Sequence, residues 1–289
     1  MDRLYIIGNG FDIDLGMDTR YSDFLDSTKF KEFAEDKLVA DFAIYLFNQN
    51  REYWVDMETA IKNYVNDNDS LDHVSFKIVF EKLKVFLRTY IQMQQSKFIQ
   101  RISDVNGYYG SSRAVMLIKK IKSEIKKSNN VKIINFNYTS DSFFRLFDNI
   151  DRFSNQNQVE IINVHGTLEV NSNIVLGVED KALRTDRSEF GFIKKGRDEN
   201  MVNTNLYNSY SKASEISFFG HSLGESDIMH FKPMFEHIFN ERKAHNVVLN
   251  FYNDGDLAHL NSRIDRLVDD NIGQFKGTSK LNFNPEIVY

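Results

Sequence analysis

Residues 4–12 read LYIIGNGFD, and this stretch decides the fold class. Its first half, residues 4–7, is a short apolar run of β-prone residues, which is typical of a buried parallel strand. Gly8 and Gly10 follow at once, and glycine lets a backbone turn tightly and approach a phosphate. A strand that runs straight into such a turn predicts an α/β protein with a nucleotide-binding edge.

The glycine turn is an incomplete dinucleotide-binding fingerprint. That pattern has another glycine three residues after Gly10, where Ile13 stands. The strand-then-glycine context still favours contact with a phosphate or ribose over a purely structural turn. We therefore take Asn9, Phe11 and Asp12 as part of the same candidate nucleotide-binding turn, although Asp12 could instead cap the next helix.

Composition excludes several classes of protein. The chain has 289 residues, of which 42% are hydrophobic and 27% charged, the balance of a soluble globular protein. It has no cysteine, so disulfides, thiolate nucleophiles and cysteine-based zinc sites are excluded. No HExxH pattern occurs among the seven histidines, and we expect no metal. A net charge of −5 argues against nucleic acid, and the absence of a long apolar run or signal segment predicts a cytoplasmic protein without membrane contact.

Strands and helices alternate after residue 130, which predicts a mainly parallel sheet. Before that point, residues 21–129 hold only two glycines and no proline, and apolar residues recur at helical spacing. We expect one Rossmann-like domain over residues 1–289, interrupted by an insertion of four to six helices at about 21–129 beside the ligand crevice. The later elements are expected as strands at 131–136, 159–164, 216–219 and 246–252, and as helices at 139–150, 198–211, 225–242 and 257–268.

Polar residues follow two of these strands. Asn137 comes after the strand at 131–136, where its amide would orient a water or ribose hydroxyl, or form an Asx turn into the next helix. His165 ends the strand at 159–164 and has the side chain of a general base near neutral pH, although a lone histidine is often structural. Because parallel strands end at one edge of a sheet, we expect both residues in one crevice.

Residues 220–224 read GHSLG and match the nucleophile elbow of α/β-hydrolases. In that reading Ser222 is the nucleophile, and Asp254 or Asp256 with His259 would complete a triad. Those partners lie in one short segment rather than at separate strand ends, which disfavours a hydrolase. The rival reading is a loop in which Ser222, Glu225 and Asp227 grip the ribose of a nucleotide.

Two carboxylates, Asp56 and Glu58, follow the single tryptophan, Trp54. They are two residues apart and so do not share one face of a helix. Taken alone, this segment is an ordinary helix start, and its role stays open.

Together these segments resemble the AbiH family of bacterial phage abortive-infection proteins. The opening motif, which runs from Leu4 through Asp12 to Gly16, Thr19, Tyr21, Asp23 and Phe24, carries most of the resemblance. Shorter shared segments are Trp54-x-Asp56-x-Glu58, Asn135 to Thr139, Val164 to Gly166, and Gly220 to Leu223 with Asp227. The resemblance implies a phage-derived trigger, and we expect a homo-oligomer.

AbiH proteins are in turn distantly similar to sirtuin-like defence domains that hydrolyse NAD. By that similarity Asn137 and His165 match the catalytic pair, and Gly8 and Gly10 match the phosphate turn. The later loop of Gly220, His221, Ser222 and Asp227 matches the ribose contact. Residues 9–12 depart from the small-residue turn of sirtuin-like domains. The resemblance implies NAD hydrolysis to nicotinamide and ADP-ribose; a non-catalytic module that senses NAD or ADP-ribose is the alternative.

Overall fold

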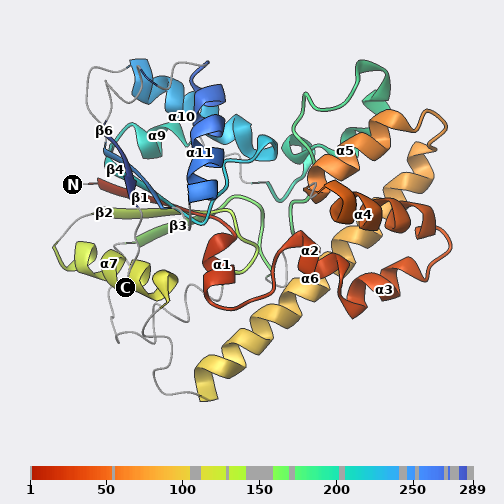
Figure 1. The fold of residues 1–289 in the computed structure, drawn as a ribbon, viewed down its shortest axis with the longest axis horizontal. Helices are drawn as coiled ribbons and strands as arrows, with labels where there is room; N and C mark the ends of the chain where they lie inside the picture. The colour runs from red at the N-terminus through yellow and green to blue at the C-terminus, as the bar shows by residue number, and fades with distance from the viewer. Residues whose placement is uncertain are drawn as a thin grey trace.

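Six parallel strands form one sheet in the order β3-β2-β1-β4-β5-β6 (Figure 1). The computed structural model describes residues 2–53, 56–104, 112–127, 130–140, 159–168, 173–201, 206–240, 246–250, 254–269, 273 and 280–284. The strands are β1 Asp2–Ile7, β2 Asn130–Asn135, β3 Val159–Asn163, β4 Ala213–Phe219, β5 Asn246–Asn250 and β6 Lys280–Asn284. This arrangement confirms the predicted α/β fold. The strand order reverses between β1 and β4, and doubly wound sheets bind ligands at the carboxyl ends of the strands at such a point.

The central strand β1 is buried on both faces, as its apolar run predicts. Leu4 and Ile6 point to a core that holds α10 (Ile228–Asn240) and α11 (Asp254–Leu267). Tyr5 and Ile7 point to the opposite core, which holds α7 (Arg113–Lys126). Alternate side chains of a strand leave on opposite faces, so one continuous apolar run packs helices on both sides.

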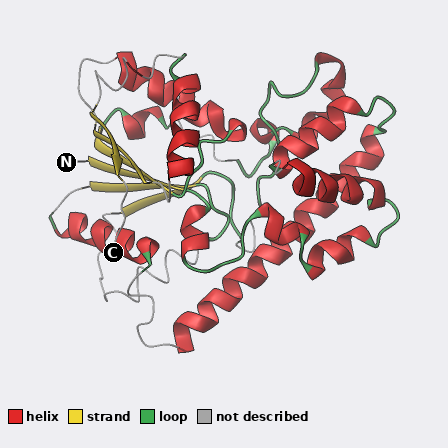
Figure 2. Ribbon diagram, in the orientation of Figure 1, coloured by secondary structure: helices red, strands yellow, loops and turns green. Residues whose placement is uncertain are grey.

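A helical layer lies beside the sheet (Figures 1 and 2). It is built from α2 (Tyr21–Leu25), α3 (Thr28–Ala34), α4 (Ala40–Tyr53), α5 (Met57–Asp67) and the first part of α6 (His73–Asp104). Its own core contains buried aromatic side chains such as Phe76, whereas Phe98 near the end of α6 joins the core under the sheet. The helix α6 therefore connects the inserted layer to the sheet. No helix in the described ranges is long and apolar enough to cross a membrane.

The chain between β3 and β4 departs from expectation. The predicted helix at 198–211 begins instead as a turn, because the Asp198 carboxylate accepts hydrogen bonds from the backbone N–H and the side chain of Asn200. Such a local bond competes with helix formation. The segment also contains η2 (Thr185–Ile193), η3 (Lys195–Arg197) and the short α9 (Tyr207–Tyr210). Most of the helix predicted at 139–150 lies outside the described residues, and β6 was not predicted.

Candidate active site

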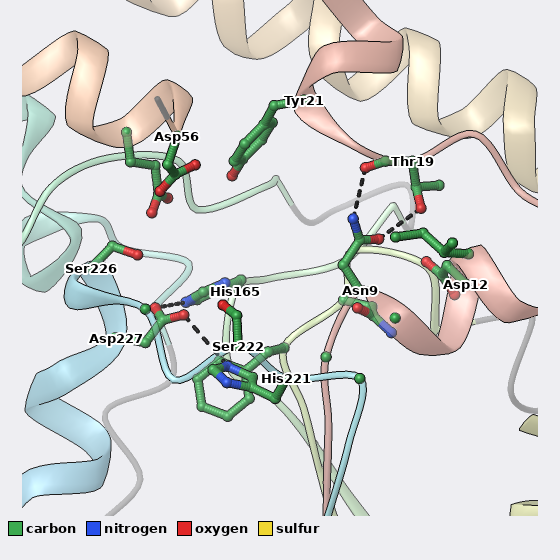
Figure 3. Close-up of a pocket in the computed structure, with 18 of the residues that line it drawn as sticks. Asn9, Asp12, Thr19, Tyr21, Asp56, His165, His221, Ser222, Ser226 and Asp227 are labelled. Atoms are coloured by element: carbon green, nitrogen blue, oxygen red, sulfur yellow. Dashed lines mark hydrogen bonds and ion pairs between the residues drawn. The ribbon is translucent and has the colours of Figure 1, made fainter. Parts of the chain in front are cut away.

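A cavity of about 550 Å³ lies at the carboxyl ends of the strands, where the sheet meets the helical layer. Its volume falls in the range of ligand pockets, roughly 300–1,000 Å³. Figure 3 shows the side chains that enter it from several separate parts of the chain. They come from the loops after β1, β2, β3 and β4, from the inserted residues Tyr21, Asp56 and Glu58, from Lys195, and from α11.

Glycines bring the first turn against the loop after β4. The N–H groups of Gly8 and Gly10 donate to the carbonyls of Phe219 and Gly220, each at 2.9 Å. A Cβ on Gly10 would lie 2.5 Å from the Cα of Gly220, and Gly220 itself has a φ of +65°. These glycines are required because two backbone segments touch. The predicted phosphate contact of this turn would therefore need donors other than these two amides.

Asn9 holds the segment that leads into the helical layer (Figure 3). Its Nδ2 donates to the Thr19 carbonyl at 3.0 Å, and its Oδ1 accepts from the Thr19 hydroxyl at 2.6 Å. Tyr21 follows two residues later and lines the cavity. Asn9 thus acts in this structure by positioning the cavity wall.

Asp12 and Phe11 have different surroundings. Asp12 is buried and lines the cavity, and its carboxylate accepts a hydrogen bond from the Thr139 hydroxyl. This bond ties the first turn to the loop after β2. Phe11, which we predicted with the nucleotide-binding turn, is buried in the core under the sheet, edge-on to Phe219 with the ring centroids 6.1 Å apart. It is not among the residues that line the cavity.

Asn137 lines the cavity with an open acceptor. The Asx turn considered for this residue is made by Asn135, whose Oδ1 accepts the Asn137 N–H at 3.0 Å. Asn135 is fixed in turn by Asn163, to which its Nδ2 donates at 2.9 Å. Asn137 Oδ1 is buried and has no hydrogen-bond partner among the described residues. A buried acceptor of this kind indicates that a ligand or water supplies the missing donor.

Asp227 is the centre of a polar cluster (Figure 3). Its Oδ1 lies 3.0 Å from His165 Nε2 and 2.9 Å from Lys195 Nζ, and its Oδ2 lies 3.5 Å from His221 Nε2. The second ring nitrogen of His221, Nδ1, accepts the Leu223 N–H at 3.0 Å. We therefore assign the proton of a neutral His221 ring to Nε2, which faces Asp227. Both carboxylate oxygens of Asp227 are thus engaged by protein groups.

Lys195 is shared by two carboxylates. Its Nζ also lies 2.9 Å from Glu58 Oε1, so a residue of α5 meets the cluster from the helical layer. Burial alone would lower the pKa of Lys195, but Asp227 and Glu58 raise it above its ordinary value, and the ammonium stays charged. Burial alone would raise the pKa of Asp227, but Lys195 and His165 hold it well below its ordinary value. For Glu58 burial dominates, and its pKa is raised despite Lys195.

Two tyrosines close the cavity near Glu58. Burial, followed by the Glu58 charge, raises the pKa of both Tyr21 and Tyr138 above the ordinary value. Both rings therefore stay neutral at physiological pH and keep their O–H donors. The Tyr138 hydroxyl donates to the Val175 carbonyl at 3.1 Å, which fixes its position.

The structure brings together most of the residues singled out from the sequence. All of the predicted site residues except Phe11 line one cavity. They are Gly8, Asn9, Gly10, Asp12, Asn137, His165, Gly220, His221, Ser222 and Asp227. Sequence reasoning missed Lys195, which stands in a run of basic residues typical of an exposed loop. It left Glu58 without a role, and Trp54 lies outside the described residues.

The elbow-like loop does not form a hydrolase triad with the described groups. In that part of the chain, no hydrogen bond joins Ser222 Oγ to a histidine, and His221 faces Asp227. His259 lines the cavity on α11, whereas the side chains of Asp254 and Asp256 lie outside the described part. Within the same described ranges, no three His, Asp or Glu side chains are arranged to hold a metal ion.

The chain matches a known protein family. A family model described as bacteriophage abortive infection AbiH matches residues 4–252. The matched range holds every cavity-lining residue except His259, Leu260 and Arg263. No curated protein matches the chain, and no solved structure matches it.

Proposed function

Since the chain belongs to the AbiH family of bacteriophage abortive-infection proteins, its role lies in abortive infection, and we propose that it acts there by hydrolysing NAD to nicotinamide and ADP-ribose. The observation that carries this proposal is the pairing of His165 with Asp227 in the cavity that also holds the open acceptor of Asn137. A histidine paired with a buried carboxylate is the arrangement that many enzymes use for a general base.

Each group has a part in the reaction. His165 removes a proton from water, and Asn137 Oδ1 accepts a hydrogen bond from that water or from a ribose hydroxyl. The bond between the anomeric carbon and the nicotinamide nitrogen breaks, and nicotinamide leaves with the bonding electron pair as a neutral base. The water oxygen adds to the oxocarbenium-like carbon, and its proton remains on His165 until it passes to solvent. Asp227 orients the His165 ring and stabilises its protonated form.

The surroundings of the pair support this chemistry. Asp227 stays ionised because Lys195 and His165 hold its pKa well below the ordinary value, so its charge is available to His165 at neutral pH. Asp56 and Glu58 place further carboxylates on the cavity wall. Burial raises the pKa of both, so the ionised Asp227 is the negative group that stabilises the positive charge of an oxocarbenium-like transition state.

Incubation of the purified protein with NAD, with and without a lysate of phage-infected cells, tests the proposal. Mass spectrometry is expected to detect nicotinamide and ADP-ribose, and His165→Ala is expected to lower turnover about 10²- to 10⁴-fold. His73→Ala serves as the matched control, because His73 is an exposed residue of α6 that does not line the cavity. Full turnover by His165→Ala would remove the proposed base. Binding of NAD without product under either condition would instead favour the nucleotide-sensing alternative.

A second experiment, on Ser222, distinguishes NAD hydrolysis through His165 from a serine hydrolase. If NAD hydrolysis proceeds through His165, the protein does not react with a fluorophosphonate probe, and Ser222→Ala retains far more NAD turnover than His165→Ala does, even where a lost ribose contact lowers it. Covalent labelling of Ser222 by that probe would point to a serine hydrolase instead.

A further inference from the structure

The phosphate groups of a nucleotide need hydrogen-bond donors, and the N–H groups of the two glycines in the first turn are already used. The N–H groups of Gly8 and Gly10 both donate to carbonyls at the end of β4 and just after it. The turn therefore offers close backbone packing rather than two amide donors. A phosphate-bearing ligand in this cavity has to find its positive partner elsewhere.

Two side chains with a fixed positive charge line the cavity in the described part of the chain, Lys195 and Arg263. Lys195 is 1% exposed and lies 2.9 Å from both Glu58 and Asp227. Its charge is already matched by two carboxylates, which would also repel a phosphate. Arg263 is partly exposed and comes from α11, and its charge acts on the Asp56 carboxyl, whose pKa it lowers against the raising effect of burial.

Arg263 has a neighbour that faces the same cavity. His259 lies four residues earlier on α11, and residues at this spacing share one face of a helix. Both side chains line the cavity. The Arg263 guanidinium donates to the Ser222 carbonyl, which holds its head group against the loop after β4. A guanidinium carries five donors in a rigid fork that matches the geometry of phosphate oxygens.

We propose that Arg263 and His259 form the phosphate-binding end of the cavity and hold the pyrophosphate of a dinucleotide or of ADP-ribose. The proposal rests on the proposed nucleotide pocket, but it concerns binding and does not depend on hydrolysis. The ligand then lies with its phosphates at α11 and its cleavable end toward His165, Asn137 and the acidic wall. This order matches NAD, whose nicotinamide ring carries a positive charge and whose pyrophosphate is negative.

Titration calorimetry on the full chain tests this assignment with three probes: ADP-ribose, inorganic pyrophosphate and adenosine. Arg263→Ala is expected to weaken the binding of ADP-ribose and pyrophosphate about 10- to 100-fold, because a charged hydrogen-bonding group is lost. Adenosine binding is expected to stay within about twofold of wild type. Arg263→Lys is expected to lose less, since it keeps the charge but not the fork.

Two further variants separate binding from folding. His259→Ala leaves the contact between Arg263 and Ser222 in place and is expected to weaken ADP-ribose binding several-fold. Arg266→Ala makes the same charge change at an exposed position of α11 that does not line the cavity, and is expected to bind as wild type does. All variants are compared by thermal melting.

The outcomes distinguish the two proposals. If Arg263→Ala and His259→Ala both bind ADP-ribose as tightly as the wild type does, the assignment of the phosphate end is overturned. The proposed nucleotide pocket is then left intact. A wild-type protein that binds neither ADP-ribose nor pyrophosphate would overturn both. A third outcome is that ADP-ribose and pyrophosphate bind to the wild-type protein and not to Arg263→Ala, while no NAD turnover is detected. This outcome would support the phosphate-binding end and count against NAD hydrolysis.

Discussion

Lys195 Nζ lies 2.9 Å from Asp227 Oδ1 and 2.9 Å from Glu58 Oε1, so one buried ammonium joins the loop after β4 to the helical layer. Burial of an ion pair contributes little net stability by itself, because both charges lose their water. Removal of one partner is strongly destabilising, since the remaining charge stays buried without an opposite charge. The cluster therefore predicts a strong dependence of the fold on Lys195.

We expect Lys195→Met to lower the free energy of unfolding by about 3–5 kcal/mol, the usual cost of breaking a buried pair. The double variant Lys195→Met with Glu58→Gln is expected to recover part of this loss, because one of the two uncompensated carboxylates is gone. Urea denaturation monitored by circular dichroism measures both. Lys194→Met is the control at the adjacent position, and a loss for Lys195→Met no larger than for this control would contradict the prediction.

Asp227→Asn is expected to lower kcat for NAD hydrolysis about 10²-fold or more, because the amide no longer stabilises the protonated ring of His165. Asp227 acts through His165, so it is a positioning residue. The affinity for ADP-ribose, measured by calorimetry, is expected to change only a few-fold. Equal losses in kcat and in ADP-ribose affinity would instead indicate that the Asp227 carboxylate binds the nucleotide directly.

Gly10→Ala is expected to destabilise the protein by about 1–3 kcal/mol, the usual cost of overpacking. The new Cβ would lie 2.5 Å from the Cα of Gly220, and neither backbone segment can move without breaking the hydrogen bond between Gly10 and Gly220. Gly273→Ala is the control, because its Cβ would meet nothing within 4 Å. The midpoint of urea denaturation is the measurement, and matching midpoints for the two variants would show that the loops can part.

The sequence predicted the arrangement at the strand ends because a parallel sheet leaves few choices. Asn137 and His165 follow adjacent strands, so their presence in one cavity follows once the strands are recognised. Lys195 could not be found in this way. It lies in η3, where no hydrophobic period marks the direction of a side chain, and its partner Glu58 is far away in the sequence. Contacts of this kind depend on how an inserted layer docks, which local patterns do not encode.

The helix predicted at 198–211 does not begin at residue 198, although residues 207–210 are helical, and the local cause of this difference leads to a prediction about pH. Asp198 Oδ2 accepts from Lys84 Nζ at 2.7 Å, and its Oδ1 accepts from Asn200. Burial alone would raise the pKa of Asp198, but Lys84 and Asn200 lower it below the ordinary value. A carboxyl whose pKa is lower in the folded than in the unfolded state stabilises the fold above its unfolded pKa, about 3.9, and loses this contribution as the pH falls through the folded pKa.

Asp198→Asn is therefore expected to be less stable than wild type by about 3 kcal/mol at pH 7, because Lys84 keeps its buried charge without a counter-charge. The difference is expected to shrink steadily below about pH 4, since a protonated Asp198 also leaves Lys84 without one. Urea denaturation of both proteins at pH 7, 5 and 3 measures this difference. The exposed Asp26 gives the control Asp26→Asn, for which a difference within about 0.5 kcal/mol is expected at pH 7. A gap between wild type and Asp198→Asn that stayed constant from pH 7 to pH 3 would mean that Lys84 does not depend on the Asp198 charge.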